Sequence, residues 1–108
     1  MKVEESEFIP LAEQTLERFL SVIEDIEPDD VDADLQDGVL TIEFDDGRTF
    51  IVNRHVPLRQ IWLSSPISGA GHFDYRDGSW IATRDGRNLA AVLQDELSKL
   101  FQAELKFL

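Results

Sequence analysis

The sequence predicts an α+β fold in which two helices pack on one face of an antiparallel sheet of about six strands. Three observations predict it: an amphipathic stretch near each end of the chain, short alternating stretches between them, and tight-turn signals that join those stretches. Links this short cannot carry a parallel crossover, so the strands should form an antiparallel meander. Each helix has one apolar stripe, so both helices can cover the same face of the sheet and leave the other face to solvent.

The first helix is expected over residues 6–26, where apolar side chains recur every three or four positions. Pro10 is compatible with a helix only near its first turn, which places the helix start within residues 6–9. Glu27 precedes Pro28, and this disfavours a longer helix. The polar face carries Glu13, Glu17, Ser21 and Glu24, with Asp25 beside them.

The second helix is expected over residues 89–101, with Asn88 as its N-cap. After it the chain alternates, and Leu105, Phe107 and Leu108 are candidates to fill a gap in the core. The expected strands between the helices are residues 31–36, 39–45, 48–53, 60–64, 72–76 and 79–83. Asp-Gly pairs at 37–38, 46–47 and 77–78 mark the tight turns.

Trp62 lies in the middle of the strand 60–64, and alternation decides which way it points. Ile61 and Leu63 share one face of this strand while Trp62 points to the other. If both helices cover the Ile61 side, Trp62 is exposed on the open face, where a large aromatic is a common binding anchor. The competing interpretation is that Trp62 is simply a core residue. The same parity places Asn53, Gln60, His72 and Asp74 on the open face.

Length and composition indicate a single domain, residues 1–108, with a core of its own. The absence of cysteine excludes a disulfide framework and thiolate metal sites. No apolar run is long enough to span a membrane, and the acidic N-terminus is unlike a signal peptide. We therefore expect a soluble cytoplasmic protein.

Charge is unevenly distributed along the chain. Residues 1–47 hold 16 acidic and 2 basic side chains, whereas residues 48–108 hold 6 acidic and 8 basic ones, so the two parts carry −14 and +2. A field of this sign repels nucleic acids and anionic lipids and attracts cations or basic protein surfaces. Partners of the first part should therefore be positively charged, and neither nucleic acid nor a membrane is expected as a partner.

The segment NRHVPLRQIWLSSPISGAGHFDY, within the order helix, meander, helix, closely resembles the frataxin family, and its bacterial members in particular. The resemblance rests on Asn53, Pro57, residues 60–65, Asp74, Trp80 and Asp85-Gly86. It implies iron binding along an acidic ridge formed by the first helix and first strand, and a role in iron–sulfur cluster assembly. In that role the ridge would dock on a basic patch of the cysteine desulfurase, and the open face would approach the scaffold protein.

Carried over by position, the resemblance implies two sets of site residues. The acidic ridge is Glu13, Glu17, Glu24, Asp25, Asp30, Asp32 and Asp34. The partner-binding set on the open face is Asn53, Gln60, Trp62 and His72. The chain departs from bacterial relatives at Leu20-Ser21, where many of them carry two adjacent acidic residues.

The spacing of the ridge aspartates decides what kind of metal site they can form. Asp30, Asp32 and Asp34 match the opening of a calcium-binding EF-hand loop, but Leu35 and Thr41 stand where that loop needs Gly and Glu. Carboxylates two apart on a strand are separated by about 6.6 Å, too far to form one tight cage. We expect weak, unselective sites for Fe²⁺, Fe³⁺ and other hard cations.

Catalytic motifs are missing from the sequence: it has no phosphate-binding loop, no G-x-S-x-G, no HExxH and no dinucleotide-binding glycine pattern. Taken with what the family resemblance implies, this favours a non-enzymatic, iron-binding regulator or adaptor of iron–sulfur cluster assembly. Two alternatives stay open: an iron-oxidising or iron-storing protein, and an acidic decoy for basic proteins. We expect a monomer, with iron-driven oligomers as an open possibility.

Overall fold

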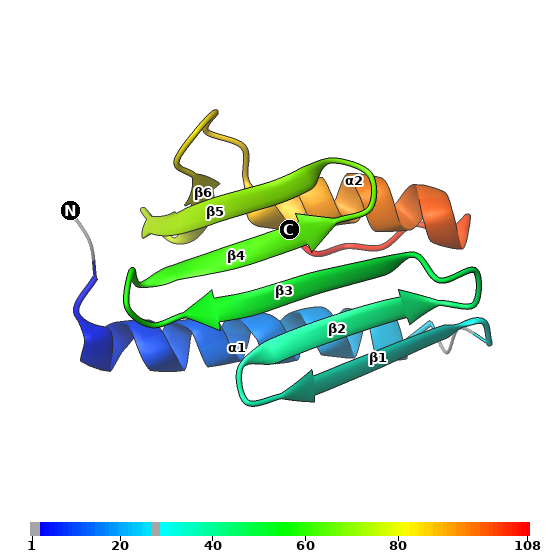
Figure 1. Cartoon of the computed structure of the whole chain (residues 1–108), viewed down its shortest axis with the longest axis horizontal. Helices are drawn as coiled ribbons and strands as arrows, with labels where there is room; N and C mark the ends of the chain where they lie inside the picture. The colour runs from blue at the N-terminus through cyan, green and yellow to red at the C-terminus, as the bar shows by residue number, and fades with distance from the viewer. Residues whose placement is uncertain (1–2, 27–28) are drawn as a thin grey trace.

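The computed structural model describes residues 3–26 and 29–108, and it places the two helices behind one six-stranded sheet (Figure 1). The helices are α1, Glu5–Glu24, and α2, Leu89–Phe101. The strands are β1 (Val31–Gln36), β2 (Val39–Phe44), β3 (Thr49–His55), β4 (Gln60–Ser65), β5 (Gly69–Arg76) and β6 (Ser79–Ala82). They lie in sequence order, and every neighbouring pair is antiparallel. The predicted fold class is confirmed.

α1 begins one residue before the expected window and ends at Glu24, with Asp25 as its C-cap. Pro10 is its sixth residue, just beyond the first turn. The expected stop at Glu27-Pro28 lies outside the described residues. α2 has the predicted bounds, and Asn88 caps it by accepting a hydrogen bond from the Ala91 N–H at 3.2 Å.

The core fills the space between the helices and the sheet. α1 and α2 contribute one buried stripe each, and the helix-facing residues of β2 to β5 close the other side. The fully buried side chains include Phe8, Leu16, Phe19, Leu40, Ile42, Phe50, Ile61, Phe73, Leu89 and Leu93. Burial of one face of each strand leaves the opposite face of the sheet without a covering layer, as alternation requires.

The C-terminal segment completes the core with two of its three candidates. Leu105 and Phe107 are buried, and the Phe107 ring meets Phe19 edge-on at 5.3 Å. Leu108 is instead 68% exposed. The backbone of this segment is held by Gln94, whose side-chain oxygen accepts from the Phe107 N–H at 3.0 Å, and by Arg18, which donates to the Phe107 carbonyl. The tail therefore ties α2 to α1.

Among the described residues, no helix is both long and apolar enough to cross a membrane.

β5 is the one strand whose start differs clearly from the expectation: it begins at Gly69 rather than at His72. Gly71 pairs with Leu63 there, and a Cβ on Gly71 would lie 2.8 Å from the Phe73 ring. Glycine at this position thus leaves room for the buried Phe73 ring against the strand.

Candidate functional site

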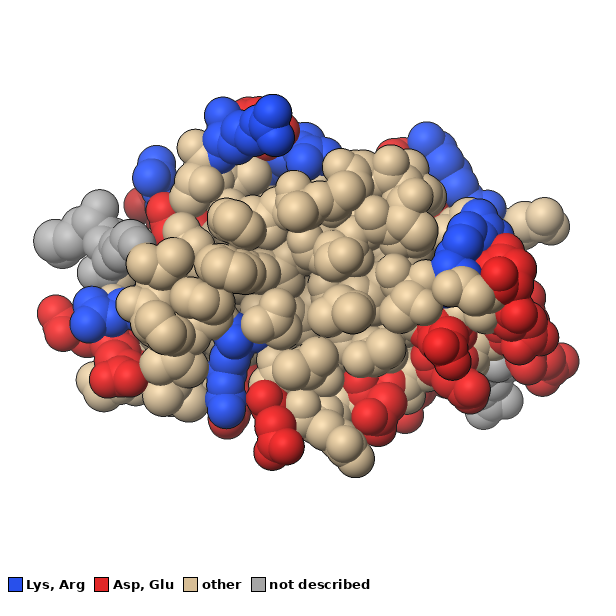
Figure 2. Space-filling model, in the orientation of Figure 1, with Lys and Arg blue, Asp and Glu red and all other residues tan. Residues whose placement is uncertain are grey.

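The acidic ridge is formed where α1 lies against β1. All seven of its carboxylate residues are exposed: Glu13, Glu17 and Glu24 on α1, Asp25 at its C-cap, Asp30 before β1, and Asp32 and Asp34 on β1. Figure 2 shows acidic side chains gathered along the β1 side of the molecule, next to an open face that carries few charges over β3 to β5. The two expected sets of residues therefore occupy neighbouring surfaces.

The ridge carboxylates do not converge on one point. Within residues 3–26 and 29–108, no three Asp, Glu or His side chains come together as a metal-binding group. Asp32 and Asp34 point outward two residues apart on β1, and Asp32 lies directly opposite Glu43 of β2. Hard carboxylate oxygens suit iron and other hard cations, so the ridge can offer one or two ligands per ion with water supplying the rest.

Within the part of the chain that the structure describes, Glu13 is the one ridge residue that is paired with a cation of the chain itself. Its Oε1 lies 2.6 Å from Nη1 of Arg54, which reaches from the end of β3 to α1. The Arg54 side chain crosses closely over Gly38, where a Cβ would lie 2.5 Å from Nε. Sequence analysis missed Arg54, although alternation from Asn53 already places it on the helix side of β3. Part of the ridge charge is therefore neutralised internally.

On the open face, one row of side chains runs across the sheet. Strand register places Val39, Asn53, Trp62 and His72 side by side on β2, β3, β4 and β5. Trp62 points outward, as predicted, but it is half-buried rather than bare. Its indole lies between two imidazoles: the His55 ring centroid is 3.9 Å away at an interplanar angle of 5°, and that of His72 is 4.2 Å away at 20°.

A hydrogen-bond chain fixes the edge of the indole. The Trp62 Nε1–H donates to Oε1 of Gln60 at 2.8 Å, and Nε2 of Gln60 donates to Oδ1 of Asp74 at 3.0 Å. Asp74 also lies 3.6 Å from the Arg76 guanidinium. Gln60 and Asp74 are on the open face by parity, yet they are only 7% and 8% exposed. Gln60 is therefore buried, and it holds the Trp62 indole through this hydrogen bond.

His55 is a further residue of this site that the sequence analysis did not single out. Its Nδ1 accepts a hydrogen bond from the backbone N–H of Leu58 at 3.3 Å, which orients the ring. Asn53 donates from Nδ2 to the carbonyl of Arg54 at 3.2 Å and remains half-buried beside Trp62. The signal that could have found His55 is its place two residues after Asn53, which puts both side chains on the same face of β3. In the structure it lies directly opposite Gln60.

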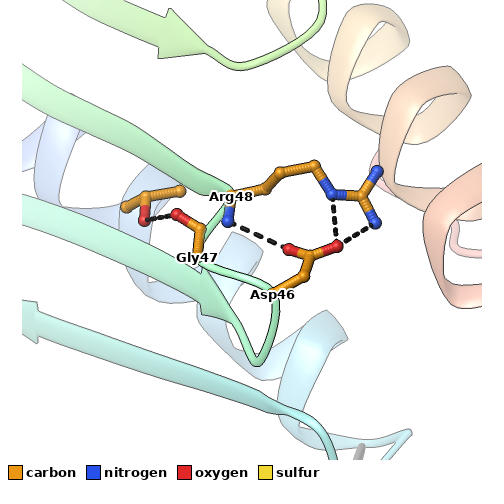
Figure 3. A network of polar contacts seen from close by, with 4 residues as sticks. Asp46, Gly47 and Arg48 are labelled. Atoms are coloured by element: carbon orange, nitrogen blue, oxygen red, sulfur yellow. Dashed lines mark hydrogen bonds and ion pairs between the residues drawn. The ribbon is translucent and has the colours of Figure 1, made fainter.

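The β2–β3 turn holds a second kind of carboxylate, which is engaged locally. Asp46 accepts from the Arg48 backbone N–H at 3.0 Å and from the Arg48 Nε at 2.8 Å, and Arg48 Nη2 lies 2.7 Å from its Oδ2. Figure 3 draws these contacts within the turn. The backbone hydrogen bond from Arg48 is the main cause that lowers the pKa of Asp46 below its ordinary value, and the guanidinium adds to it. This arrangement stabilises the turn.

Two curated relatives cover most of this chain. An iron-sulfur cluster assembly protein CyaY of Vibrio cholerae serotype O1 is 41% identical over 95 residues, which are 88% of this chain and 89% of that protein. A mitochondrial frataxin homolog of Schizosaccharomyces pombe is 34% identical over 107 residues, covering 94% of this chain and 68% of that protein.

Solved structures agree in fold. Frataxin from Psychromonas ingrahamii superposes with a TM-score of 0.86 at 34% identity, covering 98% of this chain and 99% of that one. Trimeric frataxin from Saccharomyces cerevisiae, complexed with ferrous iron, gives 0.76 at 34% identity, with 94% and 89% covered. The family model for the frataxin-like domain matches residues 1–103. With its fold, its relatives and this match in agreement, the chain belongs to the frataxin-like family.

Proposed function

We propose that this chain is a non-catalytic iron-binding protein that assists or regulates iron–sulfur cluster assembly. The observation that carries the proposal is the adjacency of two unlike surfaces: seven exposed carboxylates on α1 and β1, and an open sheet face ordered around Trp62. The name of the Vibrio cholerae relative and the ferrous complex of the yeast protein support the same assignment.

The acidic ridge is the proposed iron site. Because its carboxylates are exposed and spread along a helix and a strand, each ion would meet one or two of them. Sites of this kind bind several ions weakly, with dissociation constants roughly micromolar or higher, and discriminate poorly among hard cations. Glu13 should contribute least, since Arg54 already neutralises it.

The same ridge is the proposed docking surface for a basic patch of the cysteine desulfurase. Charge complementarity of this sort raises association rates and orients the partners. Iron and the desulfurase would then compete for one set of carboxylates. This competition makes the iron load of the ridge a natural regulator of docking.

The open face is the proposed docking surface for the scaffold protein. Trp62, a half-buried aromatic held on both sides, has the features of an interface anchor, which is typically a rigid aromatic surrounded by uncharged neighbours. An acidic decoy would need the charge of the ridge but would have no use for an ordered aromatic stack on the adjacent face. The stack therefore favours the assembly role over the decoy.

Two variants separate the two surfaces. In pull-downs with purified desulfurase and scaffold, Asp32→Asn combined with Asp34→Asn should weaken desulfurase binding and leave scaffold binding unchanged. Trp62→Ala should weaken scaffold binding by about fivefold or more, as expected for an anchor residue, and leave desulfurase binding unchanged. Trp62→Phe keeps a ring but lacks the hydrogen bond to Gln60, and it controls for loss of local order.

Iron binding is measured separately by isothermal titration. The Asp32/Asp34 double variant should bind fewer ions than wild type, whereas Glu13→Gln should have a smaller effect than either single aspartate change. Unchanged partner binding in both the aspartate and tryptophan variants would refute the proposed function. One tight, saturable iron site would refute the weak-site description of the ridge.

A further inference from the structure

Both histidines of the chain lie against one indole. The sequence contains two histidines, His55 and His72, and the strand register brings them to opposite faces of Trp62. Centroid distances of 3.9 and 4.2 Å, with the rings nearly parallel, are stacking contacts. Neither π-face of the indole is therefore available to a docking partner, which meets only the edge of Trp62 and the outer faces of the two imidazoles.

The orientation of the stack is fixed from several sides. The Leu58 N–H donates to Nδ1 of His55, and the Trp62 Nε1–H donates to Gln60. The His72 backbone is held by Thr83, whose N–H donates to its carbonyl at 2.9 Å. With its faces and its polar edge engaged, the indole is held in one orientation before any partner arrives.

The charged groups around the stack already have partners, or stand at its margin. On β5, Asp74 is engaged by Gln60 and lies near Arg76. In the loop after β6, a cavity of about 380 Å³ beside His72 is lined by Arg84, Asp85 and Arg87, and Asp85 lies 2.9 Å from Arg87.

On the His55 side, Arg54 pairs with Glu13, and Arg59 donates to the carbonyl of Val3 at 3.3 Å. Protonation of the two imidazoles would therefore add positive charge beside two carboxylates, Asp74 and Asp85, that already have partners.

We propose that His55 and His72 are positioning residues that clamp Trp62, and that their protonation weakens docking of the scaffold at the open face. The proposal rests on the proposed function for the identity of the partner. Histidine is the side chain whose charge ordinarily changes between about pH 5 and 8, and both histidines of this chain lie in the clamp.

The direction of the effect follows from solvation. In the free protein, a protonated imidazole is stabilised by the indole face and by water. A docked partner removes the water, and burying a charge is unfavourable. Docking should therefore be tighter at about pH 8 than at about pH 6. The expected difference is about two- to fivefold, within the range of single exposed charge interactions.

The clamp itself is tested on the isolated protein by NMR. The indole N–H signal of Trp62 should move with the ring protons of both histidines between about pH 5 and 8. Trp80 is the internal control, because its indole is 6% exposed and donates to Thr15 at 2.9 Å, so its signal should stay in place. A Trp62 signal that ignores the histidine titration would overturn the proposal.

Two double variants separate position from charge. His55→Phe with His72→Phe keeps stacked rings but cannot be protonated, so the indole should stay ordered while the pH response disappears. His55→Ala with His72→Ala should abolish the pH response and also lower the heteronuclear NOE of the Trp62 indole. An unchanged NOE in the alanine variant would rule out the clamp.

Scaffold binding at about pH 6 and 8 completes the test. Wild type should bind more tightly at the higher pH, and the ratio of the two affinities should fall to one in the phenylalanine variant. A ratio of one in wild type, tighter binding at the lower pH, or a ratio that persists in the phenylalanine variant would each overturn the proposal. No scaffold binding at either pH would instead refute the proposed function, while the NMR titration still tests the clamp.

Discussion

On the acidic ridge, seven carboxylates stand in solvent, and within the described parts of the chain Glu13 alone among them has a side-chain ion-pair partner. On the open face, three stacked rings and a hydrogen-bond chain from Trp62 through Gln60 to Asp74 hold one another. The ridge offers charge with little fixed geometry, whereas the open face offers geometry with little net charge. Charge alone suits a hydrated cation or a basic protein patch, whereas docking that depends on shape needs the fixed geometry of the open face.

The largest expected difference between the two regions is in stability. Asp74→Ala should lower the free energy of unfolding by about 1–3 kcal/mol, because it leaves the buried Gln60 amide without its acceptor. Asp34→Ala removes an exposed carboxylate of the ridge and should be close to neutral. Urea denaturation of both variants measures the contrast. Equal losses would mean that the open face is no better ordered than the ridge.

On the ridge itself we expect a smaller change in the free energy of unfolding, and of opposite sign. Asp32 lies directly opposite Glu43, and like charges in such pairs are destabilising. Asp32→Asn combined with Asp34→Asn should therefore raise the free energy of unfolding by about 0.2–1 kcal/mol. Salt and divalent cations should raise the melting temperature of wild type and do so less in the variant. Melting curves that respond equally would contradict the crowding of charge on this edge.

The smallest expected effect concerns Asp46, whose pKa is lowered by the Arg48 backbone N–H and then by its guanidinium. A lowered pKa stabilises the folded state above the ordinary pKa of the group, and this contribution is lost as the pH falls through the lowered value. Asp46→Ala should therefore reduce the melting temperature slightly at neutral pH, and the difference should shrink in acid. Asp45→Ala, at the neighbouring exposed carboxylate, is the control for the loss of one negative charge from this turn.

Local patterns predicted the elements well where they were strong. The periodicity of α1 and α2 and the Asp-Gly turns at 37–38 and 77–78, both with positive φ at each residue, matched the structure. The start of β5 was missed because Gly69, Ala70 and Gly71 read locally as a loop. Pairing with β4 overrides that weak local preference.

The site was predicted in part. Alternation correctly turned Trp62 away from the helices, but it treated the open face as uniformly solvated and so expected Gln60 and Asp74 to be accessible. They are instead buried, and the Gln60 side chain is hydrogen-bonded to both Trp62 and Asp74. The roles of the ridge residues stay a prediction, since their exposure is consistent with cation binding but does not demonstrate it.

By itself, the sequence determined the order of the elements, the face on which each strand is buried, and the concentration of negative charge in the first 47 residues. These properties depend on neighbours a few positions apart. Only the tertiary structure decided that Arg54 reaches Glu13 and that His55 and His72 enclose Trp62. Alternation gives the face on which each of these residues lies, but the contacts themselves depend on strand register and helix placement, which join residues far apart in the chain.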